Sequence, residues 1–259
     1  MPYNPNVVPR LYIKSQGEQT TKLALQLTTA KRKTVVRFTG GCGKMSDQDA
    51  ANLLDLFTRA FIGYDGAAIY GGTRMLRRDD PTESVMGITE VPSHLRSLCP
   101  DMVLLGVVPR TQDLGLCEQG MIVANDANDP YFTIVHPEQD ITLVVQVSAD
   151  NPEVWDAEYQ ECMRITNDLK EYCNFKSILI SYNGGSVTER EILRTAEKGW
   201  PVILIKDSGR KTDEYANNRE FLALRTNVRV VEKDAASLRA ALVEFGAVPE
   251  RRLHIVKTA

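Results

Sequence analysis

Four short glycine turns are the residues of this chain best suited to binding chemistry. Glycine allows a positive φ and a close approach of a ligand to the backbone, and a turn that opens a helix presents free N–H groups to an anion. The turns are Thr39-Gly40-Gly41-Cys42-Gly43, Gly71-Gly72-Thr73, Asn183-Gly184-Gly185-Ser186 and Asp207-Ser208-Gly209-Arg210. One such turn alone only permits a tight connection, but four together predict a site for a phosphate-bearing ligand.

Known phosphate loops fit these turns poorly. Gly43 and Lys44 match the end of a Walker A loop, but Met45 stands where Ser or Thr would hold magnesium, and Phe38 where the first glycine belongs. The glycines around position 42 form a degraded dinucleotide fingerprint, and Tyr70 takes the place of the acid that would contact ribose. We therefore expect neither an ordinary P-loop NTPase nor an NAD dehydrogenase.

Charged residues near the turns have two interpretations. Arg74, Arg77 and Arg78 follow the second turn and can make bidentate contacts with a phosphate, and Arg74 is favoured because it is nearest. The alternative is a solvated helix face, which the acidic Asp79 and Asp80 support.

The first turn precedes a helix start. Ser46 predicts an N-cap with Asp49 as its capping-box partner, and Asp47 with Asp49 favours capping over a phosphate there. Cys42, at the start of this helix, is either a thiol of lowered pKa or a small buried residue.

Strand-like apolar runs alternate with amphipathic helical stretches along the chain. The runs are residues 34–38, 67–70, 102–108, 141–147, 177–181, 202–205 and 227–231. Strands that are apolar on both parities and separated by helices are typical of a parallel sheet covered on both faces. We predict an α/β, Rossmann-like, doubly wound fold of about six mostly parallel strands with helices on both faces, and all four glycine turns at one edge.

The remaining segments complete this organisation. Residues 1–33 are expected to be an N-terminal extension that adds an edge hairpin, and residues 34–259 a single domain. Pro109 and Arg110 should end the third strand, and residues 111–140, which lack a clear period, should form a long irregular connection. A helix after residue 152 is expected to bury one face formed by Trp155, Tyr159, Cys162, Ile165, Leu169 and Tyr172.

Five motifs in chain order resemble the SLOG superfamily. They are Phe38-Thr39-Gly40-Gly41, Tyr70-Gly71-Gly72-Thr73, Gly106-Val107-Val108-Pro109, Tyr182-Asn183-Gly184-Gly185 and Asp207-Ser208-Gly209-Arg210-x-x-Asp213. The resemblance covers roughly residues 34–216 and is greatest to the prokaryotic branch akin to the N-terminal, LSDAT-type sensor region of TRP-melastatin channels. It implies binding of a nucleotide or nucleotide-derived signal.

The resemblance also implies a set of ligand-contacting residues. Carried over by position, it comprises Gly40, Gly41, Gly71, Gly72, Thr73, Asn183, Gly184, Gly185, Ser208, Gly209 and Arg210. The neighbouring residues that we add to the predicted site are Thr39, Arg74, Pro109, Arg110, Ser186, Asp207 and Asp213.

Residues 183–191 are more distantly similar to the PGG-x-GT-x-EE motif of the Lonely-guy phosphoribohydrolases, with Thr188 and Glu191 in register. The departures are Asn183 for Pro, Val187 for the third glycine and Arg190 for the first glutamate. The carboxylate pair needed around an oxocarbenium-like centre is thereby halved. If the chain is an enzyme, the resemblance makes Glu191 catalytic, with Glu189 as runner-up, but a binding module is the better interpretation.

Composition narrows the function further. The chain has 259 residues and a formal net charge of −3, which argues against a nucleic-acid platform. No apolar run approaches the length of a membrane span, and the N-terminus has no signal-like apolar region. The five cysteines form no C-x-x-C pair, so reduced thiols and no metal are expected.

We therefore predict a cytoplasmic sensor that binds an ADP-ribose-like, NAD-like or cyclic nucleotide. It is expected to form a homo-oligomer, because a single sensor domain needs a partner to act through. The alternative is a nucleotide N-glycosidase, and no further cofactor is implied.

Overall fold

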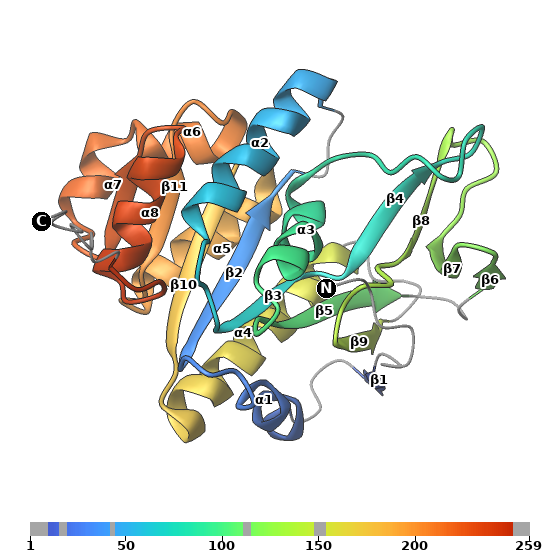
Figure 1. Cartoon of the computed structure of the whole chain (residues 1–259), viewed down its shortest axis with the longest axis horizontal. Helices are drawn as coiled ribbons and strands as arrows, with labels where there is room; N and C mark the ends of the chain where they lie inside the picture. The colour runs from blue at the N-terminus through green and yellow to red at the C-terminus, as the bar shows by residue number, and fades with distance from the viewer. Residues whose placement is uncertain (1–9, 16–19, 42–44, 111–114, 148–153, 251–259) are drawn as a thin grey trace, which may run out of the picture.

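A central sheet of eight strands organises the chain (Figure 1). The computed structural model describes residues 10–15, 20–41, 45–110, 115–147 and 154–250. The strand order is β1-β9-β5-β3-β2-β10-β11-β12, and all the pairings are parallel. The strands are β1 (Arg10–Ser15), β2 (Thr34–Gly40), β3 (Ala67–Gly71), β5 (Val103–Arg110), β9 (Ile141–Gln146), β10 (Lys176–Tyr182), β11 (Val202–Ile205) and β12 (Val228–Val231).

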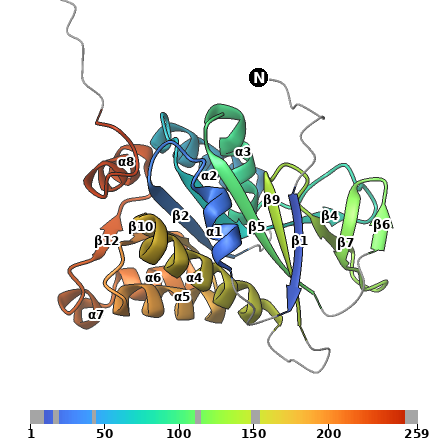
Figure 2. The same cartoon turned by 90° about the horizontal axis from the view of Figure 1, so that it is seen from below.

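Helices cover both faces of this sheet (Figure 2). The helices are α1 (Thr21–Leu27), α2 (Asp47–Ala60), η1 (Ile88–Glu90), α3 (Val91–Leu98), α4 (Val154–Cys173), α5 (Ser186–Glu197), α6 (Arg210–Ala216), α7 (Arg219–Ala223) and α8 (Ala235–Glu244). α2, α3 and α8 pack on one face, and α1, α4, α5 and α6 on the other. The predicted doubly wound α/β fold is confirmed, with eight strands instead of about six. None of the described helices is long and apolar enough to cross a bilayer.

Local sequence accounts for these elements. β3 and β11 are buried at every residue, as expected for strands covered on both faces. Ser46 caps α2, because its Oγ accepts a hydrogen bond from the Asp49 backbone N–H at 3.2 Å. Leu53 and Phe57 of this helix are fully buried against the sheet, which confirms the predicted amphipathic stripe.

The described residues of the N-terminal segment form an edge strand, as expected, but no hairpin. β1 pairs in parallel with β9 as an edge strand, and helix α1 follows it. The buried Lys14 ammonium of β1 pairs with Glu161 of α4 at 2.7 Å. A side chain from beyond the sheet thus holds β1 in place, which a local sequence pattern does not encode.

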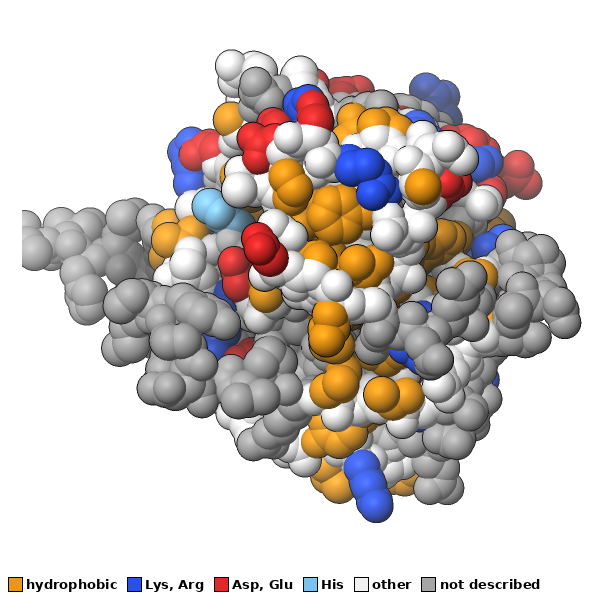
Figure 3. Space-filling view, turned by 90° about the vertical axis from the view of Figure 1, so that its right-hand side faces the viewer, with side chains coloured by type: hydrophobic (Ala, Val, Ile, Leu, Met, Phe, Trp, Pro, Cys, Tyr) orange, Lys and Arg blue, Asp and Glu red, His pale blue; other side chains and the backbone are white. Residues whose placement is uncertain are grey.

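A second, antiparallel sheet projects from the central one, in the order β4-β8-β7-β6 (Figure 1). Its strands are β4 (Thr73–Arg77), β6 (Gly115–Cys117), β7 (Gly120–Ala124) and β8 (Tyr131–Val135). The irregular connection predicted for residues 111–140 is therefore wrong. The strands are short and the pairing shifts between Ile122 and Ala124, so no period is long enough to recognise. Figure 3 shows the molecule from the side on which this second sheet lies, and hydrophobic side chains form a band on that face.

The ends of α4 differ from the predicted buried stripe. Tyr159, Cys162, Ile165 and Leu169 are buried as predicted, but Trp155 and Tyr172 are 46% and 67% exposed. A helix of this length spans about 30 Å, which exceeds the roughly 20 Å of a typical strand, so its ends extend past the sheet.

Gly106 of β5 should be intolerant of any side chain. A Cβ there would overlap the Gln139 side chain and lie 2.7 Å from the Gly72 Cα. We expect Gly106→Ala to lower the free energy of unfolding by about 1–3 kcal/mol, measured by urea denaturation.

The matched control is Gly115→Ala, where a Cβ would meet Ile122 at an ordinary 3.5 Å. This variant should change the unfolding free energy by about 0.5 kcal/mol or less. Equal losses in the two variants would contradict the close packing of β3 against β5.

Candidate functional site

The turns after β2, β10 and β11 lie side by side at the carboxyl edge of the central sheet. We call residues 39–41, 183–186 and 207–210 the three-turn cluster. β2 and β10 are neighbours, and the order of strands along the chain reverses between them. Ligands of open parallel sheets bind at such a switch point. The Gly71 turn after β3 lies at the same edge, as predicted.

Asn183 connects the three turns. A Cβ at Gly41 would lie 3.3 Å from Asn183 Nδ2, and a Cβ at Gly209 would lie 3.4 Å from Asn183 Oδ1. The Asn183 backbone N–H donates to Ser208 Oγ at 2.9 Å, and its carbonyl accepts from the Thr212 hydroxyl. Asn183 Oδ1 is buried and has no hydrogen-bond partner among the described residues, so this acceptor lacks the hydrogen bond that a buried polar atom normally has.

The backbone of the cluster is strained. The residues with positive φ here are Asn183 (62°), Gly184 (93°), Asp207 (57°), Gly209 (104°) and Arg210 (48°). Such conformations in residues other than glycine cost about 1–3 kcal/mol each and are concentrated at functional sites. The Asp213 carboxylate accepts hydrogen bonds from the Ser208 and Gly209 N–H groups, at 3.1 and 2.9 Å, so it holds the turn in this shape.

The start of α5 has the features of an anion site. Gly185 is its N-cap and provides no side-chain hydrogen bond, so the first N–H groups of the helix are not capped by a side chain. Arg210 Nη2 lies 2.9 Å from the position of a Cβ on Gly185, which places the guanidinium over this helix end. Within the described part of the chain, no carboxylate pairs with Arg210. A helix N-terminus beside an available guanidinium is suited to phosphate.

The turn after β3 does not open a helix as the other glycine turns do. β4 begins at Thr73, so no helix opens here and the predicted helix face around Arg74 is wrong. Pairing of β4 with β8 replaces it. Arg74 pairs with Glu90 at 3.1 Å and contacts His136 Nε2 at 2.9 Å, so its charge is neutralised within the protein. Gly72 serves close packing, because a Cβ there would lie 2.6 Å from the Gly106 Cα.

Pro109 and Arg110 are the last two residues of β5, which therefore extends two residues beyond the predicted end of the strand. They pair with Val145 and Gln146 of β9, whereas β3 pairs with β5 only as far as Val107. Proline is tolerated here because β5 has a strand on one side alone. Both residues are therefore two strands away from β2, and Arg110 is buried.

The two acidic residues of α5 have different environments. Glu189 is half-buried and pairs with Lys211 at 3.2 Å and with the Tyr215 hydroxyl at 2.9 Å, and these hydrogen bonds lower its pKa. Glu191 is buried, 3.5 Å from Arg37 of β2, and burial raises its pKa despite the attraction of Arg37. The Thr39 hydroxyl, which donates to Thr188 Oγ1 at 3.3 Å, also lies close enough to Glu191 to oppose the rise in its pKa, so this carboxyl lies near the three-turn cluster.

Sequence reasoning missed Glu158 and Arg37. The half-buried Glu158 of α4 lies against Gly71, where a Cβ would come within 2.7 Å of its Oε1. Burial, with the nearby Glu191 charge, raises the pKa of Glu158 to about 8. Both residues had a signal: Arg37 interrupts an apolar strand, and Glu158 lies four residues before Cys162 on the buried stripe of α4.

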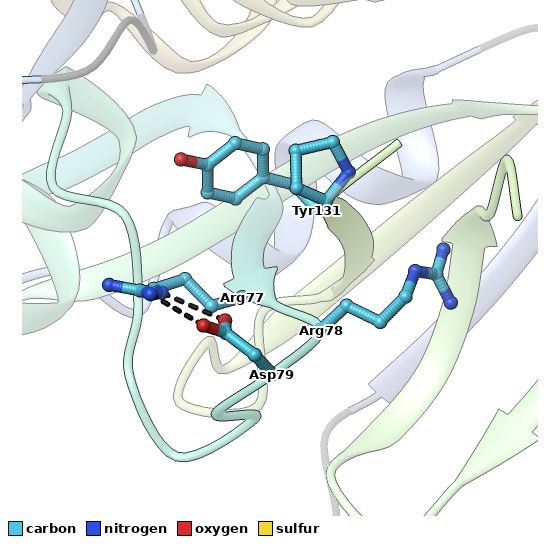
Figure 4. Close-up of a pocket in the computed structure, with 5 residues that line it drawn as sticks. Arg77, Arg78, Asp79 and Tyr131 are labelled. Atoms are coloured by element: carbon cyan, nitrogen blue, oxygen red, sulfur yellow. Dashed lines mark hydrogen bonds and ion pairs between the residues drawn. The ribbon is translucent and has the colours of Figure 1, made fainter. Parts of the chain in front are cut away.

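A separate cavity of about 450 Å³ lies at the end of β4 (Figure 4). Its lining residues are Arg77, Arg78, Asp79, Pro130 and Tyr131. Arg77 pairs with Asp79 at 2.6 Å, and Arg78 donates to the Asp129 carbonyl at 3.0 Å. Both guanidinium groups are thus engaged by the second sheet, and the cavity is not part of the three-turn cluster.

Two further predictions concern cysteines and metals. Cys42 and Gly43 of the first turn lie outside the described residues. Cys99, Cys117, Cys162 and Cys173 are free thiols. The described residues contain no group of three His, Cys, Asp or Glu side chains that could hold a metal ion.

Comparison with known proteins gives only distant structural similarities. No protein-family model and no curated protein matches the chain. The molybdenum cofactor carrier protein of Chlamydomonas reinhardtii is 15% identical, with 83% of this chain and 98% of that chain covered and a TM-score of 0.47. The structural-genomics target TM1055 is also 15% identical, with coverage of 82% and 99% and a TM-score of 0.48.

A third similar structure is the molybdenum cofactor binding protein of the phototrophic bacterium Rippkaea orientalis. It is 16% identical, covers 83% of this chain and 96% of its own, and has a TM-score of 0.44. With identities this low and TM-scores below 0.5, these similarities do not define a ligand or an activity for this chain.

The raised pKa of Glu158 predicts a pH-dependent stability. Its pKa is about 8 in the folded protein and near its ordinary value of about 4.3 when unfolded, so its stabilising contribution is present at low pH and lost as the pH rises to 8. Relative to Glu158→Gln, wild type should lose about 1–3 kcal/mol of unfolding free energy between pH 5.5 and 8.5. Urea denaturation at the two pH values measures this difference, and a constant difference would contradict a neutral Glu158.

Proposed function

We propose that this chain binds a nucleotide or nucleotide-derived ligand at the three-turn cluster, with a phosphate at the N-terminus of α5. The single observation that carries the proposal is the Arg210 guanidinium lying over the α5 N-cap, Gly185. An anion there meets backbone N–H groups, the positive end of the helix dipole and a bidentate donor.

Other cluster residues are assigned to the rest of the ligand. The backbone at Gly40 and Gly41 is proposed to contact the sugar or base, since it lies on the β2 side of the phosphate. The unpartnered Asn183 Oδ1, beside Gly209, is proposed to accept a hydrogen bond from the ligand at the β11 turn. Asp213 is proposed to shape the Ser208–Gly209 turn without touching the ligand. Arg74 and Arg110 receive no ligand role, because Arg74 is paired with Glu90 and Arg110 is buried two strands away.

We also propose a family, a compartment and an oligomeric state for the chain. We infer that the chain is a SLOG-type sensor of the kind found in the N-terminal region of TRP-melastatin channels, acting in the cytoplasm as a homo-oligomer. The support is the motif order described above and four free thiols.

An N-glycosidase is the second candidate. The observation in its favour is that a second carboxyl, Glu158, lies close enough to Glu191 for their charges to interact. Against it, Glu191 is buried beside Arg37, and Glu189 is held by Lys211 and Tyr215. Binding without turnover therefore remains the favoured function.

Removing the Arg210 guanidinium tests the phosphate site. Calorimetry with a panel of AMP, ADP-ribose, NAD and cyclic dinucleotides should find a binder, and Arg210→Ala should lose about 1.5–3 kcal/mol of affinity for it, as for a charge-assisted hydrogen bond. The matched control is Arg59→Ala on α2, an exposed arginine paired with Asp55, which should bind as wild type does. Unchanged affinity in Arg210→Ala would remove Arg210 from the site.

Release of free base distinguishes the two candidates. Wild type and Glu191→Gln are incubated with AMP, ADP-ribose and NAD, and the products are separated by chromatography. We expect no release by either protein, because the Glu191 carboxyl is buried and engaged by Arg37. Release by wild type that disappears in Glu191→Gln would establish the glycosidase in its place.

A further inference from the structure

The Glu158 side chain of α4 packs against Gly71, a position of the sheet that has no side chain. Gly71 is the last residue of β3, and a side chain there would collide with the Glu158 carboxyl, since a Cβ would lie 2.7 and 3.2 Å from its two oxygens. The carboxyl therefore lies at the level of the strand ends. Next to β3 is β2, whose turn begins the three-turn cluster.

The Glu158 carboxyl is half-buried and lacks a partner. No described residue donates a hydrogen bond to this carboxyl or forms an ion pair with it. A half-buried carboxyl without a partner in the protein is available to hydrogen-bond a ligand. Its place at the edge where ligands bind indicates a role in binding.

The arrangement of charges explains why Glu158 stays neutral. The ionisable groups that interact with Glu158 are Glu191 of α5 and Cys162 of its own helix, and neither is a cation. The cations beside these groups are already engaged: Arg37 of β2 pairs with Glu191, and Arg190 of α5 pairs at 2.8 Å with Asp156, two residues before Glu158. The remaining influences on Glu158, burial and the Glu191 charge, both favour its protonated form.

We propose that Glu158 is a specificity-determining residue that acts as a neutral carboxylic acid and donates a hydrogen bond to an uncharged acceptor of the bound ligand. This inference rests on the proposed function and adds the chemistry of a second subsite. The acceptor is a ribose oxygen or a ring nitrogen, about one strand spacing of roughly 5 Å from the turn of β2. A second anionic group at this place is excluded by Glu191.

The test compares binding at two pH values. AMP and ADP-ribose are titrated by calorimetry into wild type, Glu158→Gln and Glu158→Ala at pH 6.5 and pH 9.0. A group with a pKa near 8 is about one-tenth protonated at pH 9, so wild-type affinity should fall about tenfold more than that of Glu158→Gln, whose amide keeps its donor. Glu158→Ala has no donor and should bind weakly at both pH values.

A matched control and a second readout separate this effect from general changes. Glu171→Gln removes an exposed carboxyl on the same helix, and its profile should follow wild type. Near pH 8, calorimetry in buffers of different ionisation enthalpy should show proton uptake on binding by wild type and none by Glu158→Gln. The ionisation of the ligand phosphate is common to all variants and cancels in the comparison.

The possible outcomes distinguish a failure of the Glu158 role from a failure of the proposed function. Parallel pH profiles for wild type and Glu158→Gln, without proton uptake, would overturn the role of Glu158 while leaving the proposed binding function intact. Glu158→Ala with wild-type affinity at pH 6.5 would do the same. If neither probe binds any variant at either pH, the proposed function fails and this inference fails with it.

Discussion

The backbones of β2 and β10 approach each other so closely at the carboxyl edge that the carbonyl of Tyr182 occupies the place of a side chain on Gly40. Because the two strands stay paired to their last residues, the turns of the two halves of the fold meet. Asn183 can then reach both Gly41 and Gly209, and Arg210 can lie over Gly185. A side chain larger than hydrogen at Gly40 would separate the halves and disperse these groups.

Beneath the turns, the buried guanidinium of Arg37 decides which of the neighbouring carboxyl groups has a cation beside it. Arg37 lies in the middle of the sheet, 1% exposed, and a guanidinium enclosed in this way needs an anion. Glu191 supplies it, and Thr195 accepts a further hydrogen bond from Arg37. The neighbouring Glu158 is left without a cation, so the protein holds a carboxylate and a neutral carboxyl close together. Pairs of carboxyl groups with such different environments are a common basis for proton-dependent function.

The sequence predicted what depends on local pattern. Apolar runs on both parities indicated a parallel sheet covered on both faces, and from parallel strands it follows that glycine turns after β2, β3, β10 and β11 share an edge. Ser46 and Asp49, three residues apart, predicted the start of α2 correctly.

What the sequence did not predict depends on contacts between distant residues. Arg74 looked available for a phosphate because its partners, Glu90 and His136, are brought to it only by the fold. The strands β4, β6, β7 and β8 were missed because short, half-exposed strands carry little periodicity. Glu158 was missed because nothing local relates it to Gly71, and only their packing shows that the glycine makes room for a carboxyl.

Amide NMR spectra recorded during a titration with ADP-ribose locate the bound ligand. We expect the largest shift changes on the amides of Gly40, Gly41, Gly184, Ser186 and Arg210, on the three adjoining turns. Changes confined to the cavity around Arg78 and Tyr131, or spread evenly over the chain, would contradict this expectation.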